Sequence, residues 1–182
     1  MEEIKVKRFK DIPKFTADGN YEVHIPLVDL EGTLKSYDDR YGLMLNPDFQ
    51  RGHVWTREQQ IAWLEFYFRG GKTSRVIYFN CAEFSQGYAR NREKCDIEVM
   101  ICVDGLQRLT ALRAFLNNEV PIFGTYYKEF EDKLIWCDHV ILFNVNNLQT
   151  RKEVLTWYIE MNTGGTPHSL EEIERVKKLL NA

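Results

Sequence analysis

The feature that most constrains this chain is a nearly continuous apolar run, Ile97 to Val103, which ends in Asp104-Gly105 and leads straight into a helical pattern. A β-branched, apolar run of this length is typical of a strand buried on both faces. From Gly105 to Leu116, apolar residues recur at three- and four-residue intervals, which predicts a helix. A strand that turns directly into a helix indicates an α/β or α+β fold with a mixed sheet.

The length of the chain favours one domain. Its 182 residues can bury one core but not two independent ones, and no linker or repeat marks a boundary, so we expect a single domain over residues 1–182. Hydrophobic residues at 44% and charged residues at 28% are typical of a globular protein. The net charge of -3 gives no general reason to expect non-specific nucleic-acid binding. A chain with this net charge can still contain a local basic groove.

Periodicity and capping signals place the other elements. A Thr56-Gln59 capping box and Gly70-Gly71 bound one helix, and a Ser169-Glu172 capping box begins the last one. The stretch from Leu43 to Trp55 should be extended, because proline at position 47 excludes its predecessor from the helical region. We expect the remaining strands at residues 4–9, 21–25, 75–81 and 140–145, and the remaining helices at residues 30–41, after an Asp29 cap, and 151–160.

The cysteines and the hydropathy pattern predict a cytoplasmic protein without a membrane partner. The four cysteines form no Cys-x-x-Cys pair, and no histidine stands at zinc-finger spacing, so buried thiols are expected rather than structural zinc. No apolar segment follows the N-terminus, and no run approaches the length of a membrane span.

The strand-to-helix junction is the leading candidate site. Free backbone N–H groups and the positive end of a helix dipole favour an anion there. Arg108, one turn into the helix, can grip a phosphate through two parallel hydrogen bonds. Gln107 can orient a water molecule or a base edge, and Asp104 can hold magnesium or activate water. A purely structural alternative makes Asp104 a helix N-cap and Arg108 a surface residue paired with a carboxylate.

Two further segments are candidates. The extended segment 46–55 presents Gln50 and Arg51 on opposite faces, and Trp55 either joins a site or staples the helix that follows. The glycine-rich segment 161–167 is expected to be a turn between two helices, either an anion nest or a simple glycine-capped connector. His168 is expected to be an exposed loop residue rather than a catalyst.

Several common catalytic motifs are absent. Gly70-Gly71-Lys72-Thr73 is not a phosphate-binding loop, because Phe66 stands where that motif needs glycine and the order of strand and helix is reversed. The sequence also contains no H-E-x-x-H, G-x-S-x-G or G-x-G-x-x-G pattern.

The three candidate segments, taken in chain order, resemble the DGQQR-type ParB-like domain found in GmrSD-type modification-dependent restriction enzymes and SspE-like proteins. The family's P-x-[YF]-Q-R-x-x-x-W segment matches residues 47–55, its D-G-Q-Q-R-L-T matches residues 104–110, and its N-T-G-G-x-P-L-[ST] matches residues 162–169. The chain departs from the second motif at Leu106, where the family has glutamine.

The resemblance implies a ParB/sulfiredoxin-like fold, with a mixed sheet flanked by helices, and a nucleotide site linked to DNA defence or counter-defence between phage and bacteria. It further implies a nucleoside triphosphatase that uses Mg²⁺. The implied catalytic residues are Asp104, Gln107 and Arg108, and the implied nucleotide-binding residues are Gln50, Arg51, Trp55, Gly105, Arg108, Asn162, Thr163 and Gly164. Restriction-type members add a C-terminal HNH nuclease domain, which we do not expect in a chain that ends at Ala182.

Three functional hypotheses therefore stand at the level of sequence. The first is a nucleotide-binding domain that hydrolyses a nucleoside triphosphate with magnesium. The second is a DNA-directed protein, either a weak ParB-like nuclease or a DNA-binding subunit whose partner cleaves. The third is a non-catalytic module that binds nucleotide or a partner protein, which the Leu106 change favours.

Overall fold

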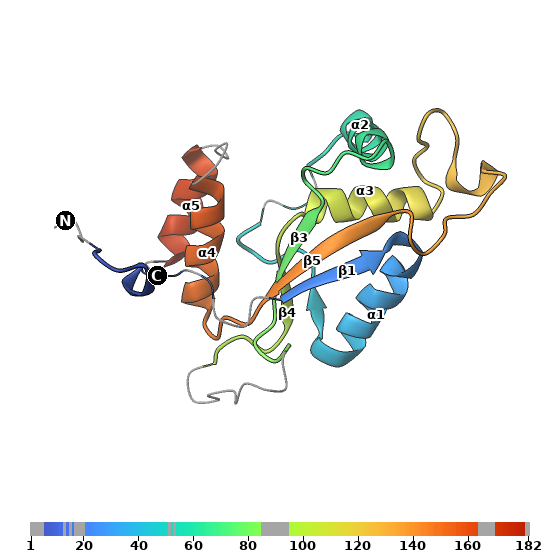
Figure 1. The fold of residues 1–182 in the computed structure, drawn as a ribbon. Coiled ribbons are helices and arrows are strands. Elements are labelled where there is room, and N and C mark those ends of the chain that lie inside the picture. Colours follow the sequence, from blue (N-terminus) through green and yellow to red (C-terminus); the bar gives the residue numbers. More distant parts are fainter. Residues whose placement is uncertain are drawn as a thin grey trace.

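The protein is a single mixed α+β domain built on a five-stranded sheet (Figure 1). The computed structural model describes residues 6–12, 14, 16, 21–50, 52, 54–84, 95–163 and 170–180. The strands are β1 (Tyr21–Pro26), β2 (Leu43–Met44), β3 (Val76–Asn80), β4 (Met100–Asp104) and β5 (Val140–Asn146). The helices are α1 (Leu30–Tyr41), α2 (Arg57–Phe68), α3 (Leu106–Leu116), α4 (Arg151–Thr163) and α5 (Leu170–Leu180).

The sheet is mixed, as expected from the sequence. Its strand order is β1-β5-β3-β4-β2, in which β1/β5 and β3/β4 are antiparallel and β5/β3 and β4/β2 are parallel. From Met100 onward, the apolar run forms with Asp104 the interior strand β4, which has neighbours on both sides, whereas residues 97–99 precede the strand. This confirms the expectation of a buried central strand.

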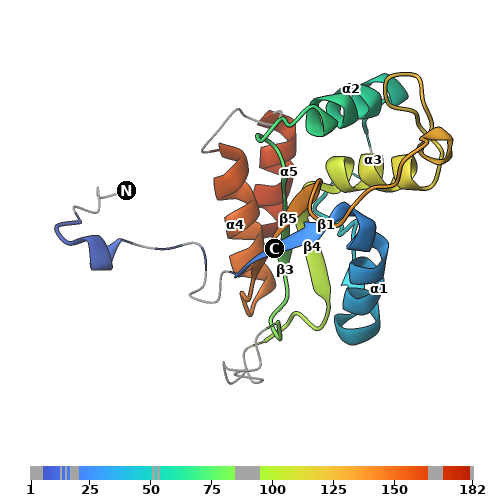
Figure 2. The same cartoon turned by 45° about the vertical axis from the view of Figure 1, so that its right-hand side comes forward.

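Both faces of the sheet are covered, because successive side chains of a strand point to opposite sides. Met100 and Cys102 of β4 pack into the larger core with residues of α1, α2 and α3. Ile101 and Val103 contact the smaller core, to which α4 contributes Trp157 and Tyr158. Figure 2 shows α4 and α5 packed side by side.

Most helix boundaries match the sequence signals. The Thr56-Gln59 capping box is present at the start of α2, and α1 ends at Gly42, which has a positive φ of 63°. Asp29 precedes α1 but makes no capping hydrogen bond with its side chain, and its carboxylate instead accepts from Trp136 Nε1 at 3.0 Å. The Ser169-Glu172 capping box lies outside the described residues.

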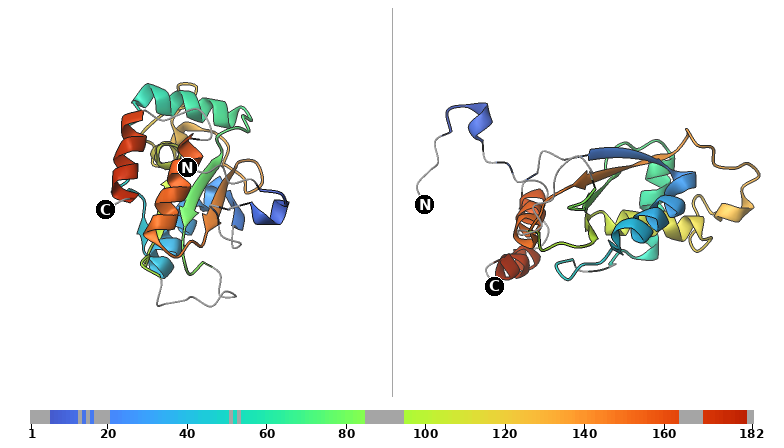
Figure 3. Two further views of the ribbon diagram at one scale, coloured as in Figure 1. Left: turned by 90° about the vertical axis from the view of Figure 1, so that its left-hand side faces the viewer. Right: turned by 90° about the horizontal axis from the view of Figure 1, so that it is seen from below.

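The strand expected at residues 4–9 is wrong over residues 6–9. A short 3-10 helix, Phe9–Asp11, follows instead and lies away from the sheet (Figure 3). Phe9 is 93% exposed. Alternating side chains form a strand only where a sheet edge offers backbone partners and an apolar surface, and residues 6–9 meet neither condition.

Candidate functional site

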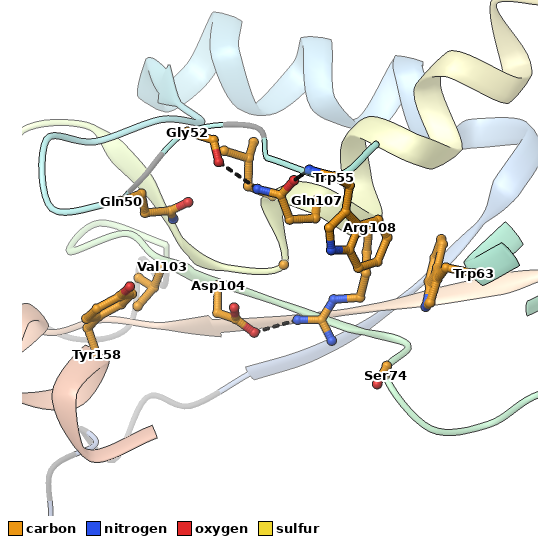
Figure 4. A pocket seen from close by; sticks show the side chains of 12 residues that line it. Gln50, Gly52, Trp55, Trp63, Ser74, Val103, Asp104, Gln107, Arg108 and Tyr158 are labelled. Carbon is orange, nitrogen blue, oxygen red and sulfur yellow. Dashed lines mark hydrogen bonds and ion pairs between the residues drawn. The ribbon is translucent and has the colours of Figure 1, made fainter. Parts of the chain in front are cut away.

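A cavity of about 330 Å³ opens where β4 ends and α3 begins (Figure 4). It brings together the segment around residues 50–55, one residue of α2, the turn before β3, the β4–α3 junction and one residue of α4. The lining residues are Gln50, Gly52, Trp55, Trp63, Ser74, Val103, Asp104, Gly105, Leu106, Gln107, Arg108 and Tyr158. Six of the predicted site residues thus meet in one place: Gln50, Trp55, Asp104, Gly105, Gln107 and Arg108.

Gly105 sets the geometry of the junction. Its φ of +99° lies in the left-handed region, which a residue with a Cβ rarely adopts. A Cβ there would also lie 2.8 Å from Ile77 Cδ1 and 3.1 Å from Ile77 Cα. The first hydrogen bond of α3 runs from Leu109 N to Gly105 O at 3.0 Å, so the N–H groups of residues 106–108 have no acceptor within the helix. These residues line the cavity.

Asp104 and Arg108 form an ion pair beside those N–H groups. Arg108 Nη2 donates to Asp104 Oδ2 at 2.5 Å, and the two side chains are 15% and 34% exposed for Arg108 and Asp104 respectively. The N-cap of α3 is Gly105, so the interpretation of Asp104 as the helix cap is wrong, whereas the pairing of Arg108 with a carboxylate is confirmed. An incoming anion would therefore either displace Asp104 from the Arg108 guanidinium or share the guanidinium with it.

The expectation that residues 43–55 are extended is wrong at residues 47–50, which form a turn closed by a hydrogen bond from Gln50 N to Pro47 O at 3.0 Å. Gln107 holds the backbone that follows this turn instead of facing the cavity with a free amide. Its Oε1 accepts from the backbone N–H groups of Val54 at 2.9 Å and Trp55 at 3.0 Å, and its Nε2 donates to Gly52 O at 2.6 Å. Both lone pairs of the oxygen are used, and one amide hydrogen remains. The contacts thus make Gln107 a positioning residue and do not support the predicted role in orienting water.

Gln50 is held against the end of β4. Its Nε2 donates to the carbonyl oxygen of Cys102 at 2.5 Å. Burial raises the pKa of the Cys102 thiol to about 12, with the nearby Asp104 carboxylate acting in the same direction, so Cys102 is a core thiol and no nucleophile. Arg51, predicted to act beside Gln50, lies outside the described residues.

Aromatic side chains form one wall of the cavity. Trp55 contacts Trp63 with ring centroids 6.0 Å apart, and Trp63 stacks on Tyr67 at 5.5 Å. Trp55 therefore packs on α2, as the stapling alternative predicted, and lines the cavity as well. In the sequence, Trp63 is visible only as part of an apolar stripe, because nothing in the linear pattern distinguishes a cavity wall from a core.

Ser74 and Tyr158 were also not predicted as site residues. Ser74 adopts a positive φ of 57°, unusual for a residue other than glycine, asparagine or aspartate, and it follows the Gly-Gly-Lys-Thr turn that does not match a phosphate-binding loop. Tyr158 comes from α4 and is 4% exposed. No signal in the sequence linked either residue to the junction, since both are brought there by tertiary packing.

Among the described residues of α4 and α5, Tyr158 is the one that lines the cavity, and it precedes the third motif. The expected turn at residues 161–163 is wrong, because α4 continues to Thr163. Asn162 is buried and its Nδ2 donates to the Tyr158 carbonyl at 2.6 Å, while the Thr163 hydroxyl donates to Ile159 O at 2.9 Å. Neither side chain lines the cavity, and both bond to their own helix. Gly164, the remaining predicted residue, lies outside the described residues.

The charges of the described lining residues cancel. Asp104 is the one carboxylate and Arg108 the one cation among them. No group of three or more His, Cys, Asp or Glu side chains suited to a metal ion occurs in the described part of the chain. If a magnesium ion were held here, Asp104 would be its one carboxylate ligand from the described lining residues, and phosphate oxygens and water would complete its coordination, as is common for this ion.

Searches against protein-family models, curated proteins and solved structures found no match for this chain. Over the described residues, the chain forms no helix with the length and apolar character needed to cross a membrane.

Proposed function

We propose that this chain is a nucleotide-binding domain of the ParB-like DGQQR type, which binds a nucleoside triphosphate with magnesium at the amino end of α3 and hydrolyses it. One observation carries the proposal: a single cavity combines the free N–H groups of α3 and the Arg108 guanidinium with an aromatic wall of Trp55 and Trp63. An anion-binding end beside aromatic rings fits a ligand that has both phosphates and a flat base.

The resemblance and the geometry support the proposal separately. Two of the three motifs that carry the resemblance contribute side chains to the same cavity, although they lie in separate parts of the sequence: Gln50 with Trp55, and Asp104 with Arg108. The setting in DNA defence or counter-defence between phage and bacteria rests on the resemblance alone.

The phosphates would bind at the junction. The backbone N–H groups of residues 106–108 and the positive end of α3 favour negative charge, and Arg108 adds a charge-assisted donor. Because Asp104 cancels the charge of Arg108, a triphosphate is expected to bind with a divalent cation rather than alone. Magnesium, held by Asp104 and the phosphates, would supply positive charge to the γ-phosphate.

Hydrolysis would give Asp104 a second role, besides holding magnesium. A water molecule adds to the γ-phosphorus, the bond to the bridging oxygen breaks, and inorganic phosphate leaves the nucleoside diphosphate. Asp104 is the one lining group among the described residues able to accept a hydrogen bond from that water as a carboxylate. Exchange of Arg108 from Asp104 to phosphate would free the carboxylate for this role.

A non-catalytic nucleotide-binding module is the second candidate. It is favoured by the hydrogen bonds of the Gln107 amide to the backbone of Gly52, Val54 and Trp55, and by the pairing of Asp104 with Arg108. Both candidates bind nucleotide through the helix terminus, Arg108 and magnesium, and an asparagine at position 104 keeps an oxygen that can hold the ion. Only turnover needs the Asp104 carboxylate to accept a hydrogen bond from water. The two candidates therefore share a ligand and differ in one measurable product.

Binding is tested by a thermal-shift panel of ATP, GTP, CTP and UTP, each with and without magnesium. At least one nucleotide should stabilise the protein, and Arg108→Gln should weaken its affinity by about tenfold or more, since a charge-assisted pair of hydrogen bonds is lost. Arg113→Gln is the matched control, because Arg113 lies on the same helix, forms an ion pair with Glu31 and does not line this cavity. Equal affinity of wild type and Arg108→Gln would refute the site.

Turnover is tested by phosphate release under saturating nucleotide. Hydrolysis abolished by Asp104→Asn with binding retained supports the enzyme. Binding without phosphate release in the wild type supports the module instead. If no nucleotide stabilises the protein, both candidates fail.

A further inference from the structure

A second cavity, of about 170 Å³, lies at the other end of α3 and shares no lining residue with the first. It is enclosed by Phe68 at the end of α2, Phe115 in the last turn of α3, and the segment of residues 117–139 that connects α3 to β5. In Figure 1 this connecting segment projects from the side of the molecule opposite α4 and α5.

The walls of this second cavity are aromatic. Phe68, Phe115, Tyr127, Phe130 and His139 all line it. Phe115 meets Phe68, Tyr127 and Phe130 in edge-to-face contacts, with centroid distances of 5.0, 5.4 and 6.2 Å, and Phe68 meets His139 in the same way at 4.7 Å. Rings at steep angles to one another form adjoining walls rather than a stack. They leave a space that no side chain fills.

The electrostatic character of the cavity favours a cation. Asp132 and Asp138 line it, against one basic residue, Lys133. The connecting segment of residues 117–139 carries five acidic and two basic residues, a formal charge of -3. Burial lowers the pKa of His139, with Asp138 opposing and Arg75 adding to the shift, so the imidazole is protonated less at neutral pH than that of a solvent-exposed histidine. The faces of aromatic rings also carry negative potential.

We propose that this second cavity binds a trimethylammonium group, as in choline or the side chain of a trimethylated lysine. Aromatic walls attract a cation but accept no conventional hydrogen bonds, so they suit a methylated ammonium better than a primary one, whose three N–H groups would lose water. The size fits a small head group, being below the roughly 300 Å³ that drug-sized ligands need. The chemistry does not suit a metal ion, because only two carboxylates are offered among the described lining residues.

Lys133 gives the proposal an internal test. Its side chain is exposed and its positive charge opposes an incoming cation. Lys133→Gln should therefore tighten binding by about two- to fivefold at low salt, whereas Asp132→Asn and Asp138→Asn should each weaken it by a similar factor. A cavity that merely accepts apolar molecules would show none of these changes.

The experiment is a ¹H–¹⁵N NMR titration of the full chain with choline, and in parallel with 3,3-dimethylbutan-1-ol, its neutral carbon analogue. Choline should bind saturably, about tenfold more tightly than the neutral analogue, with shifts gathered in residues 115–139. Phe130→Leu should lose most of the difference, whereas Phe123→Leu, an exposed ring on the same segment outside the cavity, should keep it.

A third titration, with a peptide containing trimethyl-lysine and its unmodified counterpart, distinguishes the source of the group. Tighter binding of the methylated peptide than of choline assigns the cavity to a modified protein, and the reverse assigns it to a free small molecule. No saturable choline binding, or equal affinity for choline and its neutral analogue, would overturn the proposal. Nucleotide binding at the first cavity is unaffected by either outcome.

Discussion

Replacement of Gly105 by alanine should destabilise the protein more than the same replacement at Gly124 or Gly32. The φ of +99° costs a residue with a Cβ about 1–2 kcal/mol. The new Cβ would also lie 2.8 Å from Ile77 Cδ1 and 3.1 Å from Ile77 Cα. The first atom can rotate away, but the second is backbone of the interior strand β3, and such overpacking adds about 1–3 kcal/mol.

The two effects together predict a loss of about 2–5 kcal/mol in the free energy of unfolding. In a domain of this size, 1 kcal/mol corresponds to about 2–4 °C in Tm, so a fall of roughly 10 °C is expected. The domain should remain folded at room temperature, because typical stabilities are about 5–15 kcal/mol. Nucleotide affinity should fall too, since the Cβ would lie 3.2 Å from Arg108 Nη2.

Two matched glycines separate the effects in urea denaturation. Gly124 has a φ of +78°, and a Cβ added there would meet no atom within 4 Å, so Gly124→Ala should lose only the conformational contribution of about 1–2 kcal/mol. Gly32 lies within α1 in open space, and Gly32→Ala should gain about 0.5–1 kcal/mol. If Gly105→Ala were no more destabilising than Gly124→Ala, the close approach of α3 to β3 would be refuted.

Two further predictions concern the hydrogen bonds of Gln107 and the ionisation of one buried cysteine and two tyrosines. Gln107→Ala removes the hydrogen bonds to Gly52, Val54 and Trp55 and should lower the free energy of unfolding by about 2–3 kcal/mol, measured by urea denaturation. An unchanged urea midpoint would contradict a stabilising role for these three bonds. Cys102, Tyr37 and Tyr67 all have pKa values raised to about 12, mainly by burial, so the folded state holds these protons more tightly than the unfolded state. Their contribution to stability should therefore be full below about pH 9 and fall as the pH rises toward 12, and a flat profile of Tm against pH over that range would contradict the burial.

Much of the fold was predictable because its elements carry local signals. The Thr56-Gln59 capping box, the glycine at position 42 and the apolar run before Asp104 each specify a boundary through neighbours in the chain, and the structure keeps all three. The strand expected at residues 4–9 fails over residues 6–9 for the opposite reason. Its alternation is a local pattern, but pairing depends on a distant sheet edge.

The candidate site divides in the same way. The junction of Asp104, Gly105 and Arg108 was visible because all of its groups are close neighbours in the chain. The role of Gln107 was not, since its three partners lie 52 to 55 residues away in sequence. Asn162 was predicted to bind nucleotide, but its side chain bonds to its own helix. Tyr158, an aromatic residue of the same helix that was not predicted, lines the cavity instead.

The sequence by itself determined the strand-to-helix junction, the mixed α+β class and the proximity of Asp104, Gly105 and Arg108, because these follow from short-range periodicity, capping and backbone freedom. Only the tertiary structure decided that Trp63, Ser74 and Tyr158 complete the cavity and that Gln107 bonds to Gly52, Val54 and Trp55. It also decided that a separate aromatic cavity lies at the far end of α3. The physical reason is that packing brings together side chains whose separation in the chain carries no information about their distance in space.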